Sequence, residues 1–455
     1  MRNDEVLKII RENLFYGSAD YTKNQPDLFM PHKFRMLAPS QMDSFVTTLR
    51  ESLPESEVLI YVHFPFCFSE CLFCNSFPHK VDQAIQQEYL QCLLREMDIL
   101  AAQGVFAGKR AKGIYFGGGT PTSFSNGDLG SVLGKIKAIV ELAEECSITS
   151  EAHPSTLLVK NRIEGLRAIG INRLSVGCQT FDQEILGICN RKNTEEQLRS
   201  IVNAVKAAGL AINIDMMTGL PGQTMASVRN DLAILESIKP DAVEYIRHEI
   251  VNPLAVELYK KDPSLVVDSD TLFAMVCATQ EWMAAQGYQQ NGSFSDDRQW
   301  GYRFHWLKEM PIIAFGSRTR SYTKTICYDK HEELSTYFAI VRKGISPIGR
   351  FITLTPKEQM YRSLLLQLQL KAGLDIQQFT QRFGQDPREV FAAILKKLAD
   401  FGCLEHVAGR VRLTEYGAYF VEDVCDYITD MALREESEFL VRTPHSDGGT
   451  SARLD

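Results

Sequence analysis

An alternation of strand-like and helix-like segments between residues 57 and 250 limits the possible folds more than any other feature of this sequence. Amphipathic stretches such as residues 87–103 and 195–209 repeat their apolar residues at helical spacing. They separate six strand-like runs: VLIYVHFPF (58–66), KGIYFGG (112–118), CSITSEAH (146–153), INRLSVGCQT (171–180), LAINIDMMTG (210–219) and DAVEYIRHEI (241–250). Strands joined by helices form a parallel sheet covered on both faces. The pattern predicts an α/β fold, a complete or partial barrel with its chemistry at the carboxyl ends of the strands.

The flanking segments suggest a division of the chain into four parts. These are an N-terminal extension (1–56), a core barrel (57–330), a mainly helical C-terminal domain (331–440) and a polar, disordered tail (441–455). A helix near residues 269–287 and the strand-like run at 312–322 complete or flank the barrel. The C-terminal domain shows a helix, a turn, a second helix and a small hairpin, which is typical of a winged helix.

The charge balance argues against nucleic acid as a partner. The chain has a net charge of −8, and residues 355–435, which include the winged-helix pattern, hold 10 Lys and Arg against 12 Asp and Glu. The N-terminal sequence lacks the apolar core of a signal peptide, and no run is apolar enough to span a membrane. We therefore expect a cytoplasmic protein, in which the 11 cysteines are reduced thiols or metal ligands.

Three of these cysteines form a C-x3-C-x2-C motif directly after the first predicted strand. Cys67, Cys71 and Cys74 can ligate three irons of a [4Fe–4S] cluster and leave the fourth iron open to a molecule that carries an amine and a carboxylate. The alternatives are three buried thiols or a zinc site. Structural zinc usually has four protein ligands, and neither His63 nor His79 completes such a set persuasively. We therefore favour the iron–sulfur cluster.

Further candidate ligand-binding groups follow the later strands. Gly117, Gly118 and Gly119 end the second strand and allow close backbone approach to a ligand. Polar residues at later strand ends would surround one mouth of a barrel: Glu151, Gln179, Asp215, Arg247 and His248. Arg191 reads more simply as a solvated charge at a helix end, and GLPGQT (219–224) as a turn that feeds a helix, with Thr224 as its N-cap.

Six motifs, taken in order, resemble one branch of a known superfamily. They are YVHFPFCFSECLFC, GGGTPT, the SEAHP strand, NRLSVGCQTFD, the CNR stretch and NIDMMTGLPGQT. Together they resemble the oxygen-independent coproporphyrinogen III oxidase-like branch of the radical S-adenosylmethionine (SAM) superfamily, over residues 58–435.

The resemblance implies a cluster and two SAM molecules in one barrel. The first SAM would bind the open iron and lie near Tyr61, Gly118 and Glu151. The second would lie near Phe73, Gly119, Thr120, Gln179, Arg191 and Asp215. Reductive cleavage of the first SAM would produce a 5′-deoxyadenosyl radical, with an electron donor of the flavodoxin or ferredoxin type.

The sequence departs from the oxidase at two places. The oxidase motif continues with a further cysteine two residues after the third ligand, where this chain has Ser76. The N-terminal extension also differs from the oxidase's substrate-binding segment. Class C radical SAM methyltransferases are similar over the same core, and within that class we favour methylation of menaquinone at C-8. Residues 27–37 could then make transient membrane contact, although packing on the barrel is the simpler role for them.

Three functions therefore remain open. C-methylation of an aromatic or quinone ring would yield 5′-deoxyadenosine and S-adenosylhomocysteine. Oxidative decarboxylation of a tetrapyrrole, a porphyrinogen, would yield carbon dioxide without S-adenosylhomocysteine. A heme-binding chaperone on this scaffold would bind heme with little turnover. His248 and Tyr322 are the candidate bases by residue type, and the segment around Arg318 and Arg320 could contact a propionate or a phosphate.

Overall fold

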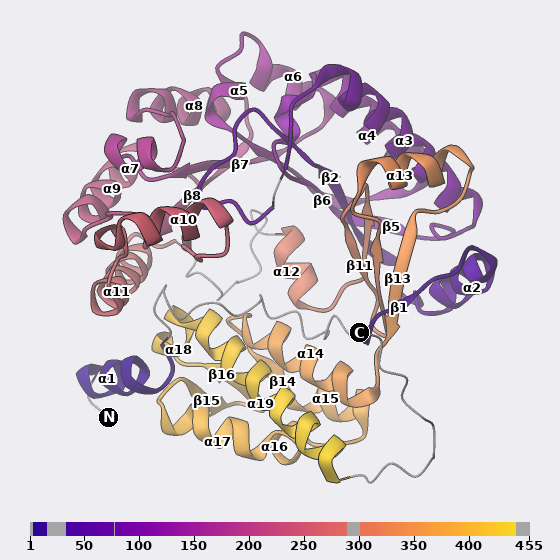
Figure 1. Cartoon of the computed structure of the whole chain (residues 1–455). Coiled ribbons are helices and arrows are strands. Elements are labelled where there is room, and N and C mark those ends of the chain that lie inside the picture. The colour runs from indigo at the N-terminus through magenta and orange to yellow at the C-terminus, as the bar shows by residue number, and fades with distance from the viewer. Residues whose placement is uncertain (1–2, 16–32, 77, 289–300, 443–455) are drawn as a thin grey trace.

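The computed structural model describes residues 3–15, 33–76, 78–288 and 301–442, without the side chains of 435–442. Its centre is a curved sheet in which seven neighbouring strands are parallel (Figure 1). These strands are β10 (Ile312–Phe315), β2 (Glu57–Phe64), β5 (Arg110–Gly118), β6 (Glu141–Ala152), β7 (Arg173–Gln179), β8 (Ala211–Thr218) and β9 (Ala242–Arg247). The six runs read from the sequence are confirmed as strands of an open barrel.

Helices cover the outer face of this sheet (Figure 1). They are α3 (Gln83–Ala102), α4 (Asn126–Ile139), α5 (Pro154–Leu157), α6 (Arg162–Ile169), α7 (Gln183–Ile188), α8 (Glu195–Ala207), α9 (Met225–Ile238) and α11 (Ser269–Ala285), whereas α10 (Pro253–Lys261) packs against Leu72. Local sequence sets their first residues: Ser125, Thr194 and the predicted cap Thr224 each accept a hydrogen bond from the third backbone amide of their helix. Short 3₁₀ turns occur at Pro39–Gln41, Pro121–Ser123 and Pro263–Leu265.

The run at residues 312–322 forms two strands rather than one. The chain turns at Gly316, with φ of +101°, and β11 (Arg320–Tyr322) returns antiparallel to β10. The sheet continues through β12 (Ile326–Lys330), β13 (Ile348–Thr353) and β1 (Arg35–Met36), with α13 (Leu334–Arg342) between β12 and β13. It therefore extends to Thr353, past the boundary at residue 331 that the sequence suggested.

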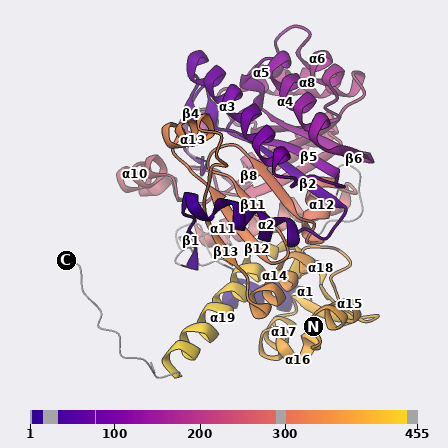
Figure 2. The same ribbon diagram turned by 90° about the vertical axis from the view of Figure 1, so that its right-hand side faces the viewer.

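The C-terminal domain lies below the open side of the sheet (Figures 1 and 2). Its elements are α14 (Pro356–Leu368), β14 (Leu374–Asp375), α15 (Ile376–Phe383), α16 (Pro387–Val390), α17 (Ala392–Asp400), β15 (Leu404–Val407), β16 (Arg410–Leu413), α18 (Glu415–Tyr419) and α19 (Val421–Arg442). The helices followed by the β15–β16 hairpin give the winged-helix-like order expected from the sequence, with β14 as a third strand beside β16.

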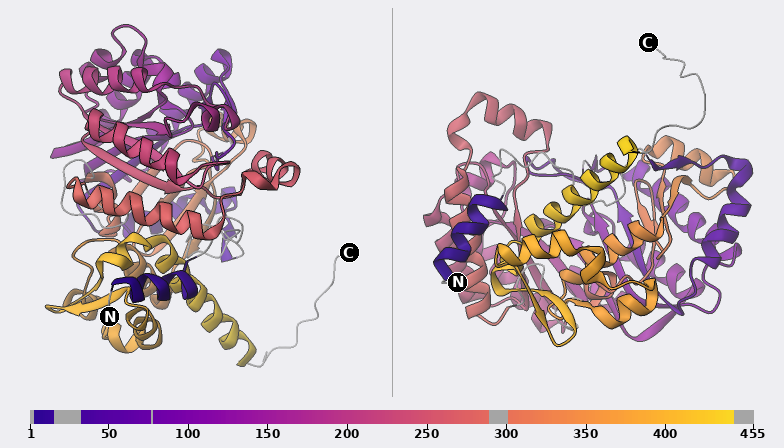
Figure 3. Two further views of the ribbon diagram at one scale, coloured as in Figure 1. Left: turned by 90° about the vertical axis from the view of Figure 1, so that its left-hand side faces the viewer. Right: turned by 90° about the horizontal axis from the view of Figure 1, so that it is seen from below.

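The N-terminal helix joins the two parts of the molecule. Helix α1 (Asn3–Asn13) lies beside α11 and the C-terminal domain (Figure 3). After it, the ring of Phe15 packs edge-on against Phe273 of α11 at 5.1 Å and Phe420 at 5.7 Å. Buried Arg247 at the end of β9 forms an ion pair with buried Asp423 of α19 at 3.0 Å. Helix α2 (Met42–Glu51) packs separately, near β13.

Helix α12 (Gly301–Leu307) occupies the inside of the sheet's curve (Figure 1). It contacts β2, β5 and β6 as well as α14. Among the described helices, none is long and apolar enough to cross a membrane. Residues 27–32 of the proposed membrane-contact segment, and residues 443–455 of the predicted tail, lie outside the described residues.

Candidate active site

The three motif cysteines lie on a loop beyond the carboxyl end of β2. Strands β3 (Phe66–Cys67) and β4 (His79–Lys80) pair at the base of this loop. The Cys67 thiol lies 3.1 Å from the hydroxyl of buried Thr120, and the Cys71 sulfur accepts a hydrogen bond of 3.7 Å from Arg191. Asn252 donates to the Cys74 carbonyl at 2.8 Å. The loop is therefore fixed by residues that follow three different strands.

The donor set of this loop fits a cluster better than a single ion. All three thiols are partly accessible and free of disulfide bonds. Within the described part of the chain, no three His, Cys, Asp or Glu side chains are positioned to hold one metal ion. A zinc ion would need its thiolate sulfurs about 3.8 Å apart, given Zn–S bonds of about 2.3 Å. Three free cysteine thiols on one loop are a donor set that suits a [4Fe–4S] cluster, so the loop can accept one.

The glycine motif lies against this loop and leaves no room for side chains. Gly118 has φ of +112°, and a Cβ there would overlap the imidazole of His63. A Cβ on Gly119 would lie 2.7 Å from the Phe66 carbonyl oxygen. The amides of Gly119 and Thr120 donate to the carbonyls of Phe64 and Phe66 at 2.9 and 2.8 Å. The motif therefore fastens β5 to the start of the cysteine loop.

Glu151 forms a small buried network with the ends of β2 and β5. It accepts hydrogen bonds from the Tyr115 hydroxyl at 2.9 Å and from the Gly118 amide at 3.0 Å. Burial raises the pKa of Glu151 to about 7. Tyr61 stacks near Tyr115, with ring centroids 6.2 Å apart. Tyr61, Gly118 and Glu151, which the resemblance assigns to one SAM molecule, are thus neighbours, and their binding role stays a prediction.

Two of the residues assigned to the second SAM molecule, Phe73 and Gln179, lie near Arg191. Its guanidinium donates to the Gly177 carbonyl and lies 5.9 Å from the ring centroid of Phe73. A Cβ on Gly177 would lie 2.6 Å from the Gln179 side-chain nitrogen, and Gln179 itself has φ of +76°. Arg191 is buried and contacts Cys71, so it is not the solvated helix-end charge that its sequence context suggested.

Asp215 lies on β8 beside β7 and is held by hydrogen bonds. It accepts from Ser175 at 3.1 Å and from Asn213. Burial raises the pKa of Asp215, and the nearby Glu151 carboxylate adds to this effect. The two predicted SAM groups therefore share one electrostatic environment inside the sheet.

The two candidate bases have different surroundings. His248 is completely buried, neither ring nitrogen has a hydrogen-bond partner among the described residues, and burial lowers its pKa to about 4. Its ring lies 6.1 Å from that of Tyr259 in α10. Tyr322 instead lines the main cavity, as do Arg318 and Arg320. Arg247 turns away from this cavity to meet Asp423. The geometry favours Tyr322 over His248, although neither catalytic role is tested.

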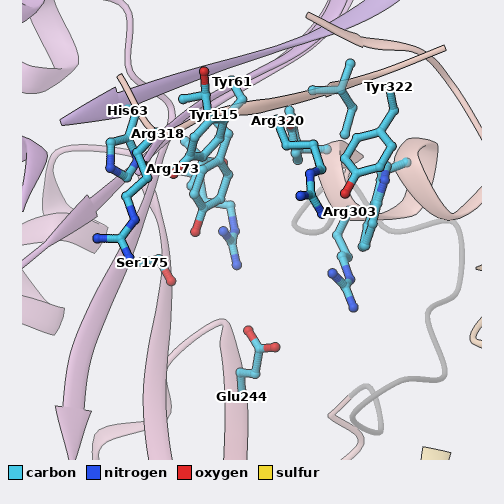
Figure 4. Close-up of a pocket in the computed structure, with 15 residues that line it drawn as sticks. Tyr61, His63, Tyr115, Arg173, Ser175, Glu244, Arg303, Arg318, Arg320 and Tyr322 are labelled. Carbon is cyan, nitrogen blue, oxygen red and sulfur yellow. Dashed lines mark hydrogen bonds between the residues drawn. The ribbon is translucent and has the colours of Figure 1, made fainter. Parts of the chain in front are cut away.

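A cavity of about 470 Å³ opens inside the curve of the sheet, in the size range of ligand sites. Figure 4 shows side chains from the strands and from residues 302–322 around it. Its lining residues are mainly aromatic and cationic: Tyr61, His63, Tyr115, Thr149, Arg173, Ser175, Glu244, Tyr302, Arg303, Trp306, Ile312, Arg318, Thr319, Arg320 and Tyr322. Four arginines face one glutamate, so the cavity suits an aromatic molecule with several carboxylates.

Three of the four arginines are held in different ways. Arg320 binds Asp329 through two hydrogen bonds of 2.6 and 3.0 Å. Arg318 donates to the Ser76 carbonyl at 3.1 Å and so connects the cavity to the cysteine loop. Arg303 lies 4.4 Å from the Trp306 ring and donates to Gln369 of the C-terminal region at 3.1 Å. The cavity is therefore assembled from both parts of the chain.

Sequence reasoning missed much of this lining. Arg173 and Glu244 lie within strands that the pattern marks as buried, and a charge in such a strand is a signal of function that could have identified them. Arg303 and Trp306 carried no such signal, because a short helix after residue 300 has no motif. The strand-end residues, in contrast, were found from their order along the chain.

Comparison with known proteins agrees with this arrangement. Residues 61–235 match the radical SAM superfamily model and residues 354–420 match the HemN C-terminal domain. The chain is 27% identical over 380 residues to the heme chaperone HemW of Bacillus subtilis (80% of this chain, 97% of that protein). It is 25% identical over 410 residues to the oxygen-independent coproporphyrinogen III oxidase of Pseudomonas aeruginosa (83% and 86%).

The fold is also that of a solved structure. The coproporphyrinogen III oxidase of Escherichia coli, a radical SAM enzyme, superimposes with a TM-score of 0.77 at 22% identity, over 92% of this chain and 99% of that one. A radical SAM domain implies a [4Fe–4S] cluster and SAM, which the cysteine loop and its neighbours can accept. The chain therefore contains a radical SAM domain over residues 61–235 and has the fold of the coproporphyrinogen III oxidase, whose branch its relatives resemble.

Proposed function

We propose that this protein is a radical SAM enzyme that acts on a tetrapyrrole with carboxylate side chains, by oxidative decarboxylation of a porphyrinogen propionate. The observation that carries this proposal is the cavity, in which four arginines surround an aromatic interior. Arginine forms paired, charge-assisted hydrogen bonds with carboxylates. Tyrosine and tryptophan rings offer flat apolar surface to pyrrole rings.

The residues of this chain would position such a substrate beside the cysteine loop. When bound, the cluster and SAM would supply a one-electron reduction and a carbon radical able to remove a hydrogen atom from the propionate. Loss of carbon dioxide from the resulting substrate radical, which leaves a vinyl group, passes one further electron to an external one-electron acceptor. Arg318 bonds the loop at Ser76 and also lines the cavity, so a carboxylate held there would lie next to the site of radical formation. The C-terminal domain lies below α12, which contacts its helix α14.

Two SAM molecules form part of the proposal. Glu151 and Asp215 are buried carboxylates on different strands, and each is the centre of its own hydrogen-bond group. One could accept hydrogen bonds from the first SAM and the other from the second. The measurement is the stoichiometry of SAM bound to reconstituted protein, expected to be two, with one site lost in an Asp215→Asn variant.

C-methylation of a quinone ring, such as menaquinone at C-8, is the second candidate. The departure at Ser76, where the oxidase motif has cysteine, favours it. The cavity argues against it, because a quinone ring has no carboxylate for the four arginines, and the relatives named above have other activities. Heme binding without turnover, as the name of the Bacillus subtilis relative suggests, is the third.

One anaerobic experiment separates these functions. Full-length protein reconstituted with iron and sulfide is incubated with SAM, a reductant and coproporphyrinogen III. Carbon dioxide, methionine and 5′-deoxyadenosine, without S-adenosylhomocysteine, support the proposal. S-adenosylhomocysteine together with a methylated acceptor, in a parallel incubation with menaquinone, supports the second candidate. A heme Soret band without product formation in either incubation supports the third. Cys67→Ala protein is the control for cluster-dependent chemistry.

A further inference from the structure

Among the described residues that line the cavity, Glu244 is the single carboxylate. It lies on β9 directly opposite Asp215 of β8 in the parallel register. Figure 4 shows its carboxyl group pointing into the space between Arg173 and Arg303. An acidic group inside a cationic cavity weakens the attraction for carboxylates, so its presence there requires another reason.

The facing carboxylates of Asp215 and Glu244 differ in the hydrogen bonds that they accept. Asp215 accepts hydrogen bonds from Ser175 and Asn213. Glu244, among the described residues, has electrostatic neighbours in Arg173 and Arg303 but no hydrogen-bond donor within bonding distance. An ionised carboxylate has about four acceptor positions, and a desolvated one without donors is costly. Glu244 therefore has free acceptor capacity directed into the ligand space.

We propose that Glu244 accepts the pyrrole N–H groups of a porphyrinogen while the arginines bind its peripheral carboxylates. This inference rests on the proposed function. A porphyrinogen has saturated bridges between its rings, so the rings can tilt and several N–H groups can converge on one acceptor. The porphyrinogen has N–H donors at its centre and carboxylates at its rim. The cavity offers Glu244 as an acceptor for the first and four arginines for the second.

The electrostatics of the empty cavity are consistent with this role. Burial raises the pKa of Glu244, and the Asp215 carboxylate raises it further, whereas Arg303 and Arg173 lower it. Hydrogen bonds to an ionised carboxylate stabilise that form. A bound set of N–H donors would therefore supply the hydrogen bonds that the described residues do not give to this side chain. A quinone carries oxygen acceptors and no N–H donors, so it would form no hydrogen bond with the ionised Glu244 carboxylate.

The test compares two ligands with the same carboxylates. Coproporphyrinogen III has four pyrrole N–H groups, and copper(II) coproporphyrin III has none, because copper replaces the N–H protons. Their dissociation constants are measured by anaerobic calorimetry with full-length, cluster-reconstituted protein. We expect Glu244→Gln and Glu244→Ala to weaken coproporphyrinogen binding by about tenfold, the effect of one charge-assisted interaction, and to leave copper coproporphyrin binding within about twofold.

Glu249→Gln is the matched control, because Glu249 follows β9 but does not line the cavity. It should leave both constants unchanged, and thermal melts confirm that each variant is folded. Equal weakening of both ligands, or no weakening, would show that Glu244 does not recognise the N–H groups. Failure of the unmodified protein to bind either ligand would instead overturn the proposed function, so the two failures are distinguishable.

Discussion

The two sides of the cavity differ in how their polar groups are satisfied. On the side of β5 to β8, the residues predicted for the cofactors are bonded mostly to one another. Glu151 binds Gly118 and Tyr115, Thr120 contacts Cys67, and Arg191 reaches Cys71. On the side of α12 and β11, by contrast, aromatic and cationic side chains face open space, and their bonds lead outward to Gln369 and Asp329.

This difference distinguishes the residues that bind the cofactors from the residues that recognise the substrate. A site for a fixed cofactor gains from groups that are already held in place, because preorganisation lowers the ordering cost of binding. A side whose charges point into a cavity is built for a ligand that brings the missing partners. We therefore assign cofactor binding to the first side. We assign substrate recognition to the second side together with Arg173 of β7 and Glu244 of β9, which also line the cavity. Each prediction below tests this division.

The largest effect is expected at the cysteine loop. Cys71→Ala should lower formation of 5′-deoxyadenosine by more than about 100-fold, because mutation of residues that only support metal ligands already costs about 10- to 100-fold. Iron content and the visible absorbance of the reconstituted protein measure the loss directly. Cys277→Ala, at a half-buried thiol of α11, is the control and should leave both unchanged. Full iron content in the Cys71 variant would contradict the cluster assignment.

A smaller but still large effect is expected at the glycine motif. Gly118→Ala places a Cβ on the His63 ring at φ of +112°, a conformation that costs about 1–3 kcal/mol for most residues. The displaced strand end should reduce SAM cleavage by about 10- to 100-fold. Gly134→Ala on α4, where a Cβ meets no atom within 4 Å, should be neutral or slightly stabilising. Normal SAM cleavage in the Gly118 variant would place the cofactor elsewhere.

The same division explains how much of the molecule could be predicted. The sheet was predictable because each parallel strand is an apolar run bounded by a helix, and the cofactor residues lie in compact motifs at the ends of these strands. The extension through β11 to β13 was not, because the turn at Gly316 and the pairing of β13 depend on tertiary contacts. Buried Glu96 of α3, for example, bonds the Gly316 amide, Lys330 and Tyr337.

The direction in which a side chain points was the second property that the sequence could not predict. Arg247 ends β9 and His248 follows it, and both were expected at the mouth with the other strand-end residues. Both are buried away from the cavity, since α19 provides an acidic partner for Arg247 and α10 packs near His248. Glu244, three residues earlier, takes the position inside. Sequence order gives the strand end, but only the packed neighbours decide which residue faces the ligand.

A more moderate effect is expected on the substrate side. Arg303→Met removes one guanidinium from the cavity and keeps an apolar chain of similar length, so coproporphyrinogen binding should weaken by about tenfold. SAM binding should change by less than about twofold, because Arg303 is held by Gln369 and Trp306, neither of which is a predicted SAM residue. Calorimetry with each ligand measures both constants. Arg167→Met, on the exposed face of α6, is the control. If the variant lost SAM binding and tetrapyrrole binding equally, the separation of a cofactor side from a substrate side would be contradicted.

The smallest effect is expected in the pH dependence of folding stability, which the ionisation of Glu151 on the cofactor side controls. Burial raises the pKa of Glu151 from an ordinary 4.5 to about 7, so between these pH values the folded protein holds a proton that the unfolded chain has released. The folded state therefore loses stability as pH rises from 4.5 to 7. Glu151→Gln removes this ionisation and keeps an acceptor for the Tyr115 hydroxyl.

We therefore expect the cofactor-free Glu151→Gln protein to gain stability relative to the unmodified protein by on the order of 2 kcal/mol as pH rises from 4.5 to 7.5. Urea unfolding at each pH measures this difference. Glu144→Gln, at an exposed position earlier in β6, should show no such trend. If the Glu151 variant behaves like the Glu144 variant, the carboxylate is solvated rather than buried, and the cofactor side lacks the preorganisation that distinguishes it from the substrate side.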